Sequence, residues 1–391
     1  MPDKYHFLYK IPSNISNGEY HHNKNIVKAS ASIFKKFRKY NEVVAISEMQ
    51  AGKTELMKRI IYIIRNYNSH LRNMDIEIDK YNIYVVLCAS SRDLKHQLKE
   101  KLPEIKRKIY HLNYIMKYLK NSYEYECDLI PMADSSLIIF DESHCDAETN
   151  KIMDKFRKII DKLAKENKTK FFKLSCSATP YEQIMSDYPK VIMKPGSNYY
   201  GIRDMFRSLD PVVIFPSKKL EDESECDALF TEIKICNYYY IFRLPGNISA
   251  QNLMVDNIEK QFKKQHMNID VHFYTMDYGS NINDLIKTKP SKPTIIYLKD
   301  KLRMGEFLDT KYVYVVHDTP ESTHTHTTVQ SLVGRCCGYN KKSHQTIIYC
   351  DYEKVLQHHK WVKHGYAKKY IPIDAKYINK RTKETKDICI Y

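Results

Sequence analysis

Residues Val43–Thr54, VVAISEMQAGKT, join an apolar run, a short loop and the tripeptide Gly-Lys-Thr at the start of an expected helix. A strand, a glycine-containing loop and a helix N-terminus together place consecutive backbone N–H groups around an anion. In such a loop the Lys53 ammonium contacts the outer phosphates of a nucleotide, and the Thr54 hydroxyl binds Mg²⁺. The stretch therefore predicts a nucleoside triphosphate site.

The match to a phosphate-binding loop has one departure. A complete loop of this type has glycine five residues before Gly52, where this chain has Ser47. Taken alone, the stretch is also compatible with a helix N-terminus that carries a solvated lysine. The interpretation therefore depends on finding the other parts of a nucleotide site elsewhere in the chain.

Length and charge limit the class of protein. The chain has 391 residues, which suits two domains better than one core. Lysine and arginine number 63 against 47 acidic residues, a formal net charge of +16. This excess favours a polyanionic partner such as nucleic acid, although a merely basic protein is the simpler alternative.

Cysteine spacing and hydropathy indicate the compartment. The ten cysteines include no CxxC pair, so neither a zinc ribbon nor a disulfide framework is predicted. The apolar runs are far too short to span a bilayer. We expect an intracellular protein in a reducing compartment, with no membrane partner.

Apolar strands alternate with amphipathic segments along the first half of the chain. The predicted strands are Val43–Ile46, Ile83–Leu87, Ser136–Phe140, Phe171–Ser175 and Val191–Met193. Alternation of strands and helices predicts a parallel sheet covered on both faces, with ligands at the carboxyl ends of its strands.

The second half repeats this alternation. Its predicted strands are Tyr238–Arg243, Val271–Thr275, Thr294–Leu298, Tyr312–Val316 and Thr346–Tyr349, with a crossover helix between Asn252 and His266. Two prolines and an acidic cluster near residues 211–227 indicate the boundary between the halves.

The predicted organisation has five parts: an extension over 1–24, a first α/β domain over 25–205, a linker over 206–228, a second α/β domain over 229–359 and a tail over 360–391. The tail holds nine Lys/Arg against three Asp/Glu, interleaved with aromatic residues. Such a composition suits a single-stranded nucleic acid track. A solvated strap held by its aromatic residues is an equal alternative.

An apolar strand also delivers two acids to its carboxyl end, since Leu137–Phe140 is followed at once by Asp141 and Glu142. In a nucleotide hydrolase the first acid holds Mg²⁺, and the second polarises a water for attack on the γ-phosphate. A surface turn explains the pair less well, because the preceding run is expected to be buried. This is the partner that the Gly-Lys-Thr loop requires.

With both motifs present, the chain resembles the superfamily 2 helicases, ATPases built from two tandem RecA-like P-loop domains with parallel sheets. Asp141–His144 resembles their DExH-type motif II. Ala89–Leu94 resembles motif Ia, Ser177–Pro180 resembles motif III, and Asp300–Gly305 matches the spacing of motif V. Gln330–Arg335 resembles the start of motif VI, QxxGRxxR, although three residues instead of two separate Gln330 from Gly334.

The resemblance implies ATP and Mg²⁺ as cofactors and assigns a role to each matched residue. Implied catalytic residues are Lys53, Glu142, Gln330 and Arg335. Implied nucleotide-binding residues are Gln50, Ala51, Gly52, Lys53, Thr54, Glu55, Asp141, Gly305 and Arg335, with Thr54 and Asp141 on the metal. Implied nucleic acid contacts are Ser90, Ser91, Arg92, Lys301 and Arg303, and implied coupling residues are His144, Ser177 and Thr179.

Motif VI departs from the family pattern, because Gly338 stands where a second arginine is normal. The arginine that stabilises the transition state must then be Arg335 or come from elsewhere, such as Arg303. The expected activity is an ATP-dependent helicase or single-strand translocase. Analogy with compact viral and phage-like helicases favours single-stranded DNA over RNA.

Two alternatives stay open at this point. One is a nucleic-acid-stimulated ATPase that remodels without unwinding, such as a nuclease motor or a transcription factor. The other is a non-hydrolysing nucleic-acid-binding scaffold, which the unusual residues Ser47 and Gly338 favour.

Overall fold

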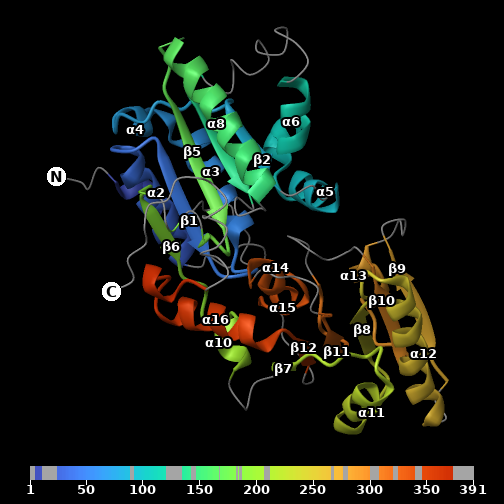
Figure 1. The fold of residues 1–391 in the computed structure, drawn as a ribbon. Coiled ribbons are helices and arrows are strands. Elements are labelled where there is room, and N and C mark those ends of the chain that lie inside the picture. The colour runs from blue at the N-terminus through green and yellow to red at the C-terminus, as the bar shows by residue number, and fades with distance from the viewer. Residues whose placement is uncertain are drawn as a thin grey trace. The chain divides into compact units, whose positions relative to one another are not determined.

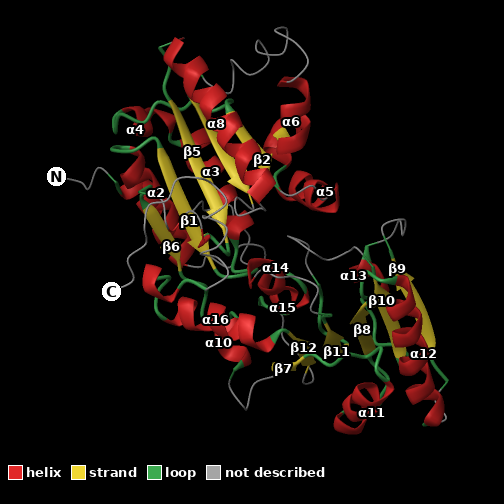
Figure 2. Cartoon of the chain, in the orientation of Figure 1, coloured by secondary structure: helices red, strands yellow, loops and turns green. Residues whose placement is uncertain are grey.

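The computed structural model describes residues 5–10, 24–88, 92–119, 134–141, 147–166, 168–181, 184, 187–206, 212–265, 268–275, 281–299, 308–319, 325–339 and 346–372. The chain divides into two compact units, Met1–Ser197 and Asn198–Tyr391. Each unit is described by itself (Figures 1 and 2). Among the described residues, no helix combines the length and the apolar character needed to cross a membrane.

The first unit is built on a six-stranded, all-parallel sheet with the strand order β3-β2-β4-β5-β1-β6. Its strands are β1 (Glu42–Ser47), β2 (Ile83–Leu87), β3 (Ile109–His111), β4 (Ser136–Asp141), β5 (Phe171–Ser177) and β6 (Lys190–Met193). Its helices are α1 (His6–Tyr9), α2 (Lys24–Phe37), α3 (Lys53–Asn66), α4 (Asn68–Arg72), α5 (Arg92–Lys101), α6 (Leu112–Leu119) and α8 (Ala147–Glu166), with a 3-10 turn at Pro103–Lys108.

Complete burial explains why the central strands read as continuous apolar runs. Every residue of β1, β2, β4 and β5 is buried, as expected for a parallel sheet with helices on both faces. On one face, α8 contributes Phe156 and Ile160 to a cluster that includes Val86 of β2 and Phe140 of β4. The apolar residues of α8 recur at helical spacing, so one side of the helix meets the sheet.

A buried ion-pair cluster lies at the amino end of β1. The Glu42 carboxylate, whose side chain is 4% exposed, forms ion pairs with Arg157 at 2.8 Å and with Lys173 at 3.2 Å. Lys173 also pairs with Asp161 at 3.1 Å. Because buried charges are tolerated only when they are paired, these contacts join α8, β1 and β5 in one arrangement.

The predicted extension over 1–24 is in part packed onto the first unit. Phe7 and Leu8 of α1 are buried. Arg59 of α3 donates to the carbonyls of Leu8 at 2.9 Å and Lys10 at 2.5 Å. Burial lowers the pKa of the Arg59 guanidinium. Helix α3 is thus tied to the segment that precedes it by about fifty residues in the chain.

The second unit has a second six-stranded, all-parallel sheet, in the order β7-β12-β11-β8-β10-β9. Its strands are β7 (Val212–Pro216), β8 (Tyr239–Arg243), β9 (Asp270–Tyr274), β10 (Thr294–Leu298), β11 (Val313–His317) and β12 (Thr346–Cys350). Its helices are α10 (Ile202–Met205), α11 (Glu223–Glu232), α12 (Ile248–Lys264), α13 (Ile282–Leu285), α14 (Thr325–Gln330), α15 (Leu332–Arg335) and α16 (Tyr352–Lys363), with a 3-10 turn at Lys368–Tyr370.

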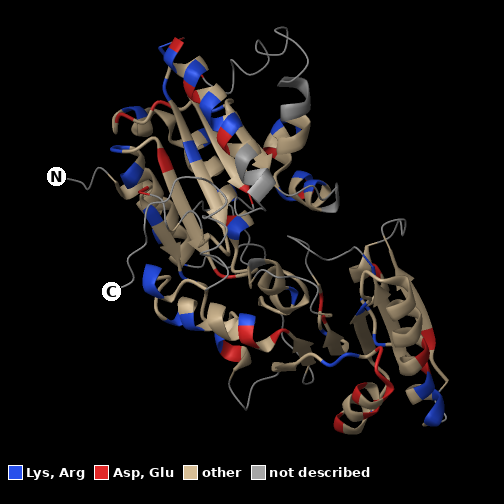
Figure 3. Ribbon diagram, viewed as in Figure 1, with Lys and Arg blue, Asp and Glu red and all other residues tan. Residues whose placement is uncertain are grey.

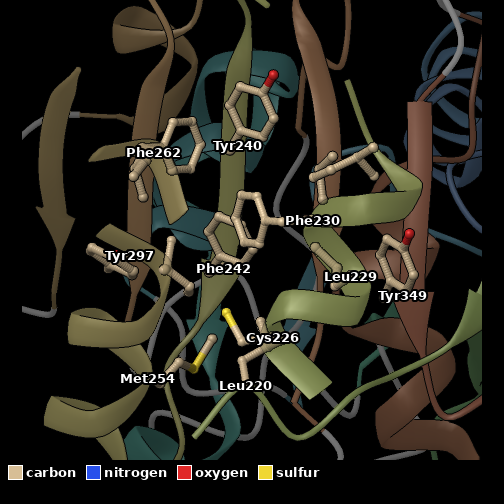
Figure 4. Packing of buried hydrophobic residues seen from close by; sticks show 14 of the residues in the cluster. Leu220, Cys226, Leu229, Phe230, Tyr240, Phe242, Met254, Phe262, Tyr297 and Tyr349 are labelled. Atoms are coloured by element: carbon tan, nitrogen blue, oxygen red, sulfur yellow. The ribbon is translucent and has the colours of Figure 1, made fainter. Parts of the chain in front are cut away.

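Aromatic side chains fill the core of the second unit (Figure 4). Phe230 of α11 and Phe262 of α12 pack with their ring centroids 5.3 Å apart. Tyr240 and Phe242 of β8 belong to the same cluster, and because they are two residues apart their side chains lie on the same face of the sheet. The two α/β units with parallel sheets confirm the predicted fold class of tandem RecA-like domains.

The predicted linker over 206–228 is wrong, because it contains secondary structure of the second unit. Its prolines flank or end β7, which pairs with β12 at the edge of the sheet. Its acidic cluster forms the start of α11, where Asp222 caps the helix. Acidic residues of α11 pair with basic residues of α12, including Asp227 with Lys264 at 3.0 Å. Figure 3 shows the acidic α11 and the basic end of α12.

The other predicted boundaries shift for related reasons. The units divide between Ser197 and Asn198, before the predicted linker. The predicted tail from residue 360 begins inside α16, where Trp361 is fully buried, and residues 373–391 lie outside the described residues.

Candidate nucleotide-binding site

The Gly-Lys-Thr stretch forms the predicted loop between β1 and α3. Two loop residues have left-handed backbone conformations, Gln50 with φ 53° and Gly52 with φ 104°. A Cβ added at Gly52 would lie 3.4 Å from the Cδ1 atom of Ile26 on α2. Glycine is therefore favoured at this position by backbone conformation, while the space around an added Cβ allows ordinary contact. Helix α3 begins at Lys53, directly after the loop.

The structure brings Lys53 and Asp141 close to each other. The Lys53 Nζ atom lies 4.0 Å from Asp141 Oδ1, and the two side chains are 14% and 7% exposed. Asp141 ends β4, and its neighbour across the ladder in β5 is Cys176. Since all strands of the sheet are parallel, the carboxyl ends of β1 and β4 share one edge. An ammonium and a carboxylate, 88 positions apart in the chain, thus face each other at the start of a helix.

The loop residues on either side of Lys53 are in different environments. Ser47, the residue in place of glycine, ends β1 and is 2% exposed. Ala51 is buried, and its N–H donates to the carbonyl of Glu48 at 3.2 Å. Thr54 is half-buried in the first turn of α3. Glu55 pairs with Lys58 at 3.0 Å, on the exposed side of α3.

Motif III begins at Ser177, the last residue of β5, which lies between β4 and β1 in the sheet. Ser177 and Thr179 are both completely buried. The Thr179 N–H donates to the Ser177 hydroxyl at 3.1 Å, a local turn that fixes the segment. This segment therefore lies at the same edge of the sheet as the loop and Asp141.

Motif VI lies in the second unit, on α14, α15 and the turn between them. Gln330 ends α14 and Arg335 ends α15. The Arg335 side chain is buried, with the residue 4% exposed, and its Nη2 atom donates to the Gln330 carbonyl at 2.6 Å. The guanidinium thus contacts the beginning of its own motif in this conformation.

Sequence reasoning missed a buried ion pair beside motif VI. Arg243, at the end of β8, donates to Asp318 at 2.6 Å, and both residues are 5% exposed. Asp318 also accepts from the N–H of Leu332 at 3.2 Å, and Arg243 donates to the Ser331 hydroxyl at 3.0 Å. The pair therefore holds the first residues of α15. No local signal marks it, because its members are 75 positions apart.

Several predicted site residues fall outside the described part of the chain. These are Ser90, Ser91, Glu142, His144, Lys301, Arg303 and Gly305. Arg92 is the first residue of α5. The assignments for these positions stay predictions.

The residues at the loop fit a magnesium nucleotide. Mg²⁺ prefers hard oxygen ligands and is commonly held by one or two carboxylates, together with water and substrate phosphates. Asp141 offers a nearly buried carboxylate and Thr54 a hydroxyl in the first turn of α3. Within the described ranges, no group of three or more His, Cys, Asp or Glu side chains could hold a metal by protein ligands alone. A shared metal–phosphate site is consistent with both facts.

The structure defines a two-unit α/β protein in which a glycine-containing loop joins β1 to α3. Solved structures with a similar fold include the Mycobacterium smegmatis helicase Lhr bound to ssDNA and AMP-PNP, at 13% identity and TM-score 0.47 over 86% of this chain. The DUF1998 helicase MrfA bound to DNA and AMPPNP is similar at 12% identity and TM-score 0.48 over 90% of this chain. The chain spans about half of each of those chains, 48% and 53%. No protein-family model matches.

The chain belongs to the family of the uncharacterized protein L594 of Acanthamoeba polyphaga mimivirus. The two are 57% identical over 390 residues, which cover 99% of this chain and 100% of the viral protein.

Proposed function

We propose that the protein is an ATP- and Mg²⁺-dependent nucleic-acid helicase or single-strand translocase. The observation that carries this proposal is the pairing of Lys53 with Asp141 at 4.0 Å, beside a left-handed glycine that opens a helix. A helix N-terminus supplies N–H donors and a partial positive charge to a phosphate group. The lysine adds a full positive charge and the carboxylate adds an anchor for the metal.

Each residue has a defined task in this proposal. Lys53 would bind the β- and γ-phosphates, and Thr54 and Asp141 would hold the metal. Glu142 would polarise the attacking water. Mg²⁺, when bound, would offset the charge of the phosphate oxygens. Ser177 at the end of β5 and Thr179, which donates to its hydroxyl, would couple the nucleotide to movement of the chain.

Arg335 is the proposed source of positive charge for the transition state. An arginine in this role must reach the γ-phosphate, where charge develops. Its guanidinium now donates to the Gln330 carbonyl. The proposed role therefore requires this hydrogen bond to break when the enzyme acts.

Nucleic acid is the proposed partner because the chain carries a formal charge of +16. Contacts between basic side chains and the phosphates of the nucleic acid backbone weaken steeply with salt. On duplex DNA, each such contact lowers the logarithm of the affinity by about 0.9 for each log unit of salt concentration. Single-stranded DNA is preferred to RNA in this proposal, and we place the protein inside the cell.

One observation favours a second candidate, a nucleic-acid-binding scaffold that binds nucleotide without hydrolysing it. Arg335 is buried against its own motif, and the next arginine of the family pattern is replaced by Gly338. A protein with no arginine for the transition state would bind ATP and turn it over at background rates.

The deciding experiment measures ATP turnover with single-stranded DNA, single-stranded RNA and duplex in parallel. The helicase proposal expects strong stimulation by one single strand and loss of turnover in Lys53→Ala and Glu142→Gln. Lys162→Ala, which removes a charge from the exposed side of α8 in the same unit, is the matched control and should keep full turnover. Background turnover that Glu142→Gln does not change would support the scaffold instead.

Strand displacement is measured on the same preparations. Displacement of a labelled strand from a partial duplex, lost in Lys53→Ala, supports a helicase. Stimulated ATP turnover without displacement would reduce the proposal to a translocase or remodelling ATPase.

A further inference from the structure

Gly338 is part of a two-way backbone contact rather than a gap in motif VI. Its N–H donates to the carbonyl of Tyr200 at 2.8 Å, and the Tyr200 N–H donates to the Gly338 carbonyl, also at 2.8 Å. The two residues form an isolated antiparallel bridge. Gly338 has φ 134°, a conformation that residues with a Cβ rarely adopt. An arginine at this position would therefore strain the bridge.

Tyr200 has a second anchor in the sheet. Its hydroxyl donates to the carbonyl of Val212, the first residue of β7, at 2.8 Å. Next to it, the rings of Tyr199 and Tyr339 meet edge to face, with centroids 5.5 Å apart. The bridge is thus fixed by two backbone hydrogen bonds, one side-chain hydrogen bond and one ring contact.

The partner strand of the bridge is the start of the second unit. Asn198 is the first residue of that unit, so the chain that arrives from the first unit is bonded to motif VI within three residues. Farther along, Phe206 packs on His359 of α16 with centroids 4.7 Å apart. Residues 198–206, the junction segment, therefore contact the rest of the second unit at both ends.

The other end of motif VI is also fixed. Asp318 accepts from the N–H of Leu332, at the start of α15. Between Leu332 and Gly338 lies Arg335, three residues before the bridge. The backbone of residues 332–338, which carries Arg335, is consequently fixed at one end by the Arg243–Asp318 ion pair and at the other by the Tyr200–Gly338 bridge.

We infer that the Tyr200–Gly338 bridge positions Arg335, with Tyr200 as a positioning residue, and that glycine stands at 338 because the bridge requires it. This inference rests on the proposed ATP hydrolysis. In this inference, residues 198–206 influence the position of Arg335 directly. A displacement of Tyr200 moves Gly338, to which it is hydrogen-bonded, and therefore moves the backbone three residues after Arg335. Tyr200 acts on the maximal rate of hydrolysis and leaves nucleotide binding at Lys53 unchanged.

The test compares Gly338→Arg and Gly338→Ala with the parent protein. If position 338 were simply a lost arginine, Gly338→Arg would raise ATP turnover above that of the parent. The inference expects both variants to lower kcat, roughly fivefold or more given the cost of an unfavourable backbone conformation, with an unchanged KM for ATP. Tyr200→Phe keeps the backbone bridge and loses only the hydroxyl, so its kcat should fall less, by roughly two- to threefold.

Gly365→Ala is the matched control. Gly365 has φ 63°, follows α16 and has no heavy atom within 4 Å of an added Cβ. Its substitution should strain the second unit without touching motif VI, and kcat should stay at the parent value. The thermal midpoint of every variant is followed by the fluorescence of Trp361, which is fully buried in this unit.

The results distinguish a failure of the inference from a failure of the proposed function. A rise of kcat in Gly338→Arg, or equal kcat losses in the Gly338 variants and Gly365→Ala, would overturn the inference and leave the proposed function standing. A parent protein without ATP turnover would refute the proposed function, and the inference would fall with it.

Discussion

Removal of the Asp318 carboxylate should strongly destabilise the second unit. Asp318 and Arg243 form an ion pair of 2.6 Å with side chains 7% and 6% exposed. In Asp318→Ala the Arg243 charge stays buried, and the N–H of Leu332 loses its acceptor. Breaking a buried pair from one side costs about 3–5 kcal/mol. This is a large part of the ~5–15 kcal/mol that holds an ordinary domain folded.

Urea unfolding followed by Trp361 fluorescence measures this cost. Trp361 is the only tryptophan of the chain and is fully buried in α16, so its signal follows the second unit. With an m value of about 2 kcal/mol/M, the expected loss moves the unfolding midpoint down by about 1.5–2.5 M. Lys292→Ala removes an exposed pair with Asp270, at 2.8 Å in the same unit, and should cost no more than about 1 kcal/mol.

The double variant Arg243→Met/Asp318→Leu identifies the source of the cost. Apolar side chains leave no buried charge, so most of the lost stability should return. A midpoint for Asp318→Ala equal to that of Lys292→Ala would refute the reasoning, because the pair would then contribute no more than a surface contact.

Three further predictions concern single positions. Burial lowers the pKa of His317 to about 4, so the unfolded chain binds an additional proton below pH 6.5. The free energy of unfolding of the second unit should therefore fall by about 3 kcal/mol as the pH drops from 6.5 to 4, and urea titrations of His317→Gln should show a flatter dependence. Gly52→Ala should weaken nucleotide binding roughly tenfold or more, because φ 104° opposes a Cβ. Titration with a fluorescent ATP analogue measures this loss, and an unchanged affinity would contradict it. Glu42→Ala removes the carboxylate that pairs with Arg157 and Lys173, whereas Lys173 keeps its pair with Asp161. It should cost the first unit about 1–3 kcal/mol, seen as faster hydrogen exchange in β1 and β5 with an unchanged tryptophan transition.

Most strands of both sheets could be predicted because a strand that is buried on both faces appears in the sequence as a continuous run of apolar residues. Ile83–Leu87 and Thr294–Leu298 have the predicted bounds, since each is an unbroken apolar run. Strand β3 was missed because three residues give no recognisable period. Strand β7 was missed because its prolines indicate a boundary; at the edge of the sheet, Pro216 is tolerated.

The candidate site was predictable only where its chemistry is local. Asp141 follows an apolar run directly, and Gly52 and Lys53 follow one after a short loop, so the end of each strand could be located from the sequence. The Arg243–Asp318 pair joins the ends of two strands and has no sequence pattern. Gly338 looked like a lost arginine because a residue's φ angle and its partner at Tyr200 are properties of the folded chain.

The contact between α1 and Arg59 sets a rule for shortening this protein. Arg59 lies on the helix that Lys53 begins, and its Nη2 atom donates to the carbonyls of Leu8 and Lys10. A version trimmed to start at Lys24 would lose both acceptors, and a lost hydrogen bond from a charged donor costs about 1.5–3 kcal/mol. An engineer who wants a minimal ATP-binding fragment should therefore keep the first ten residues or replace Arg59 together with them.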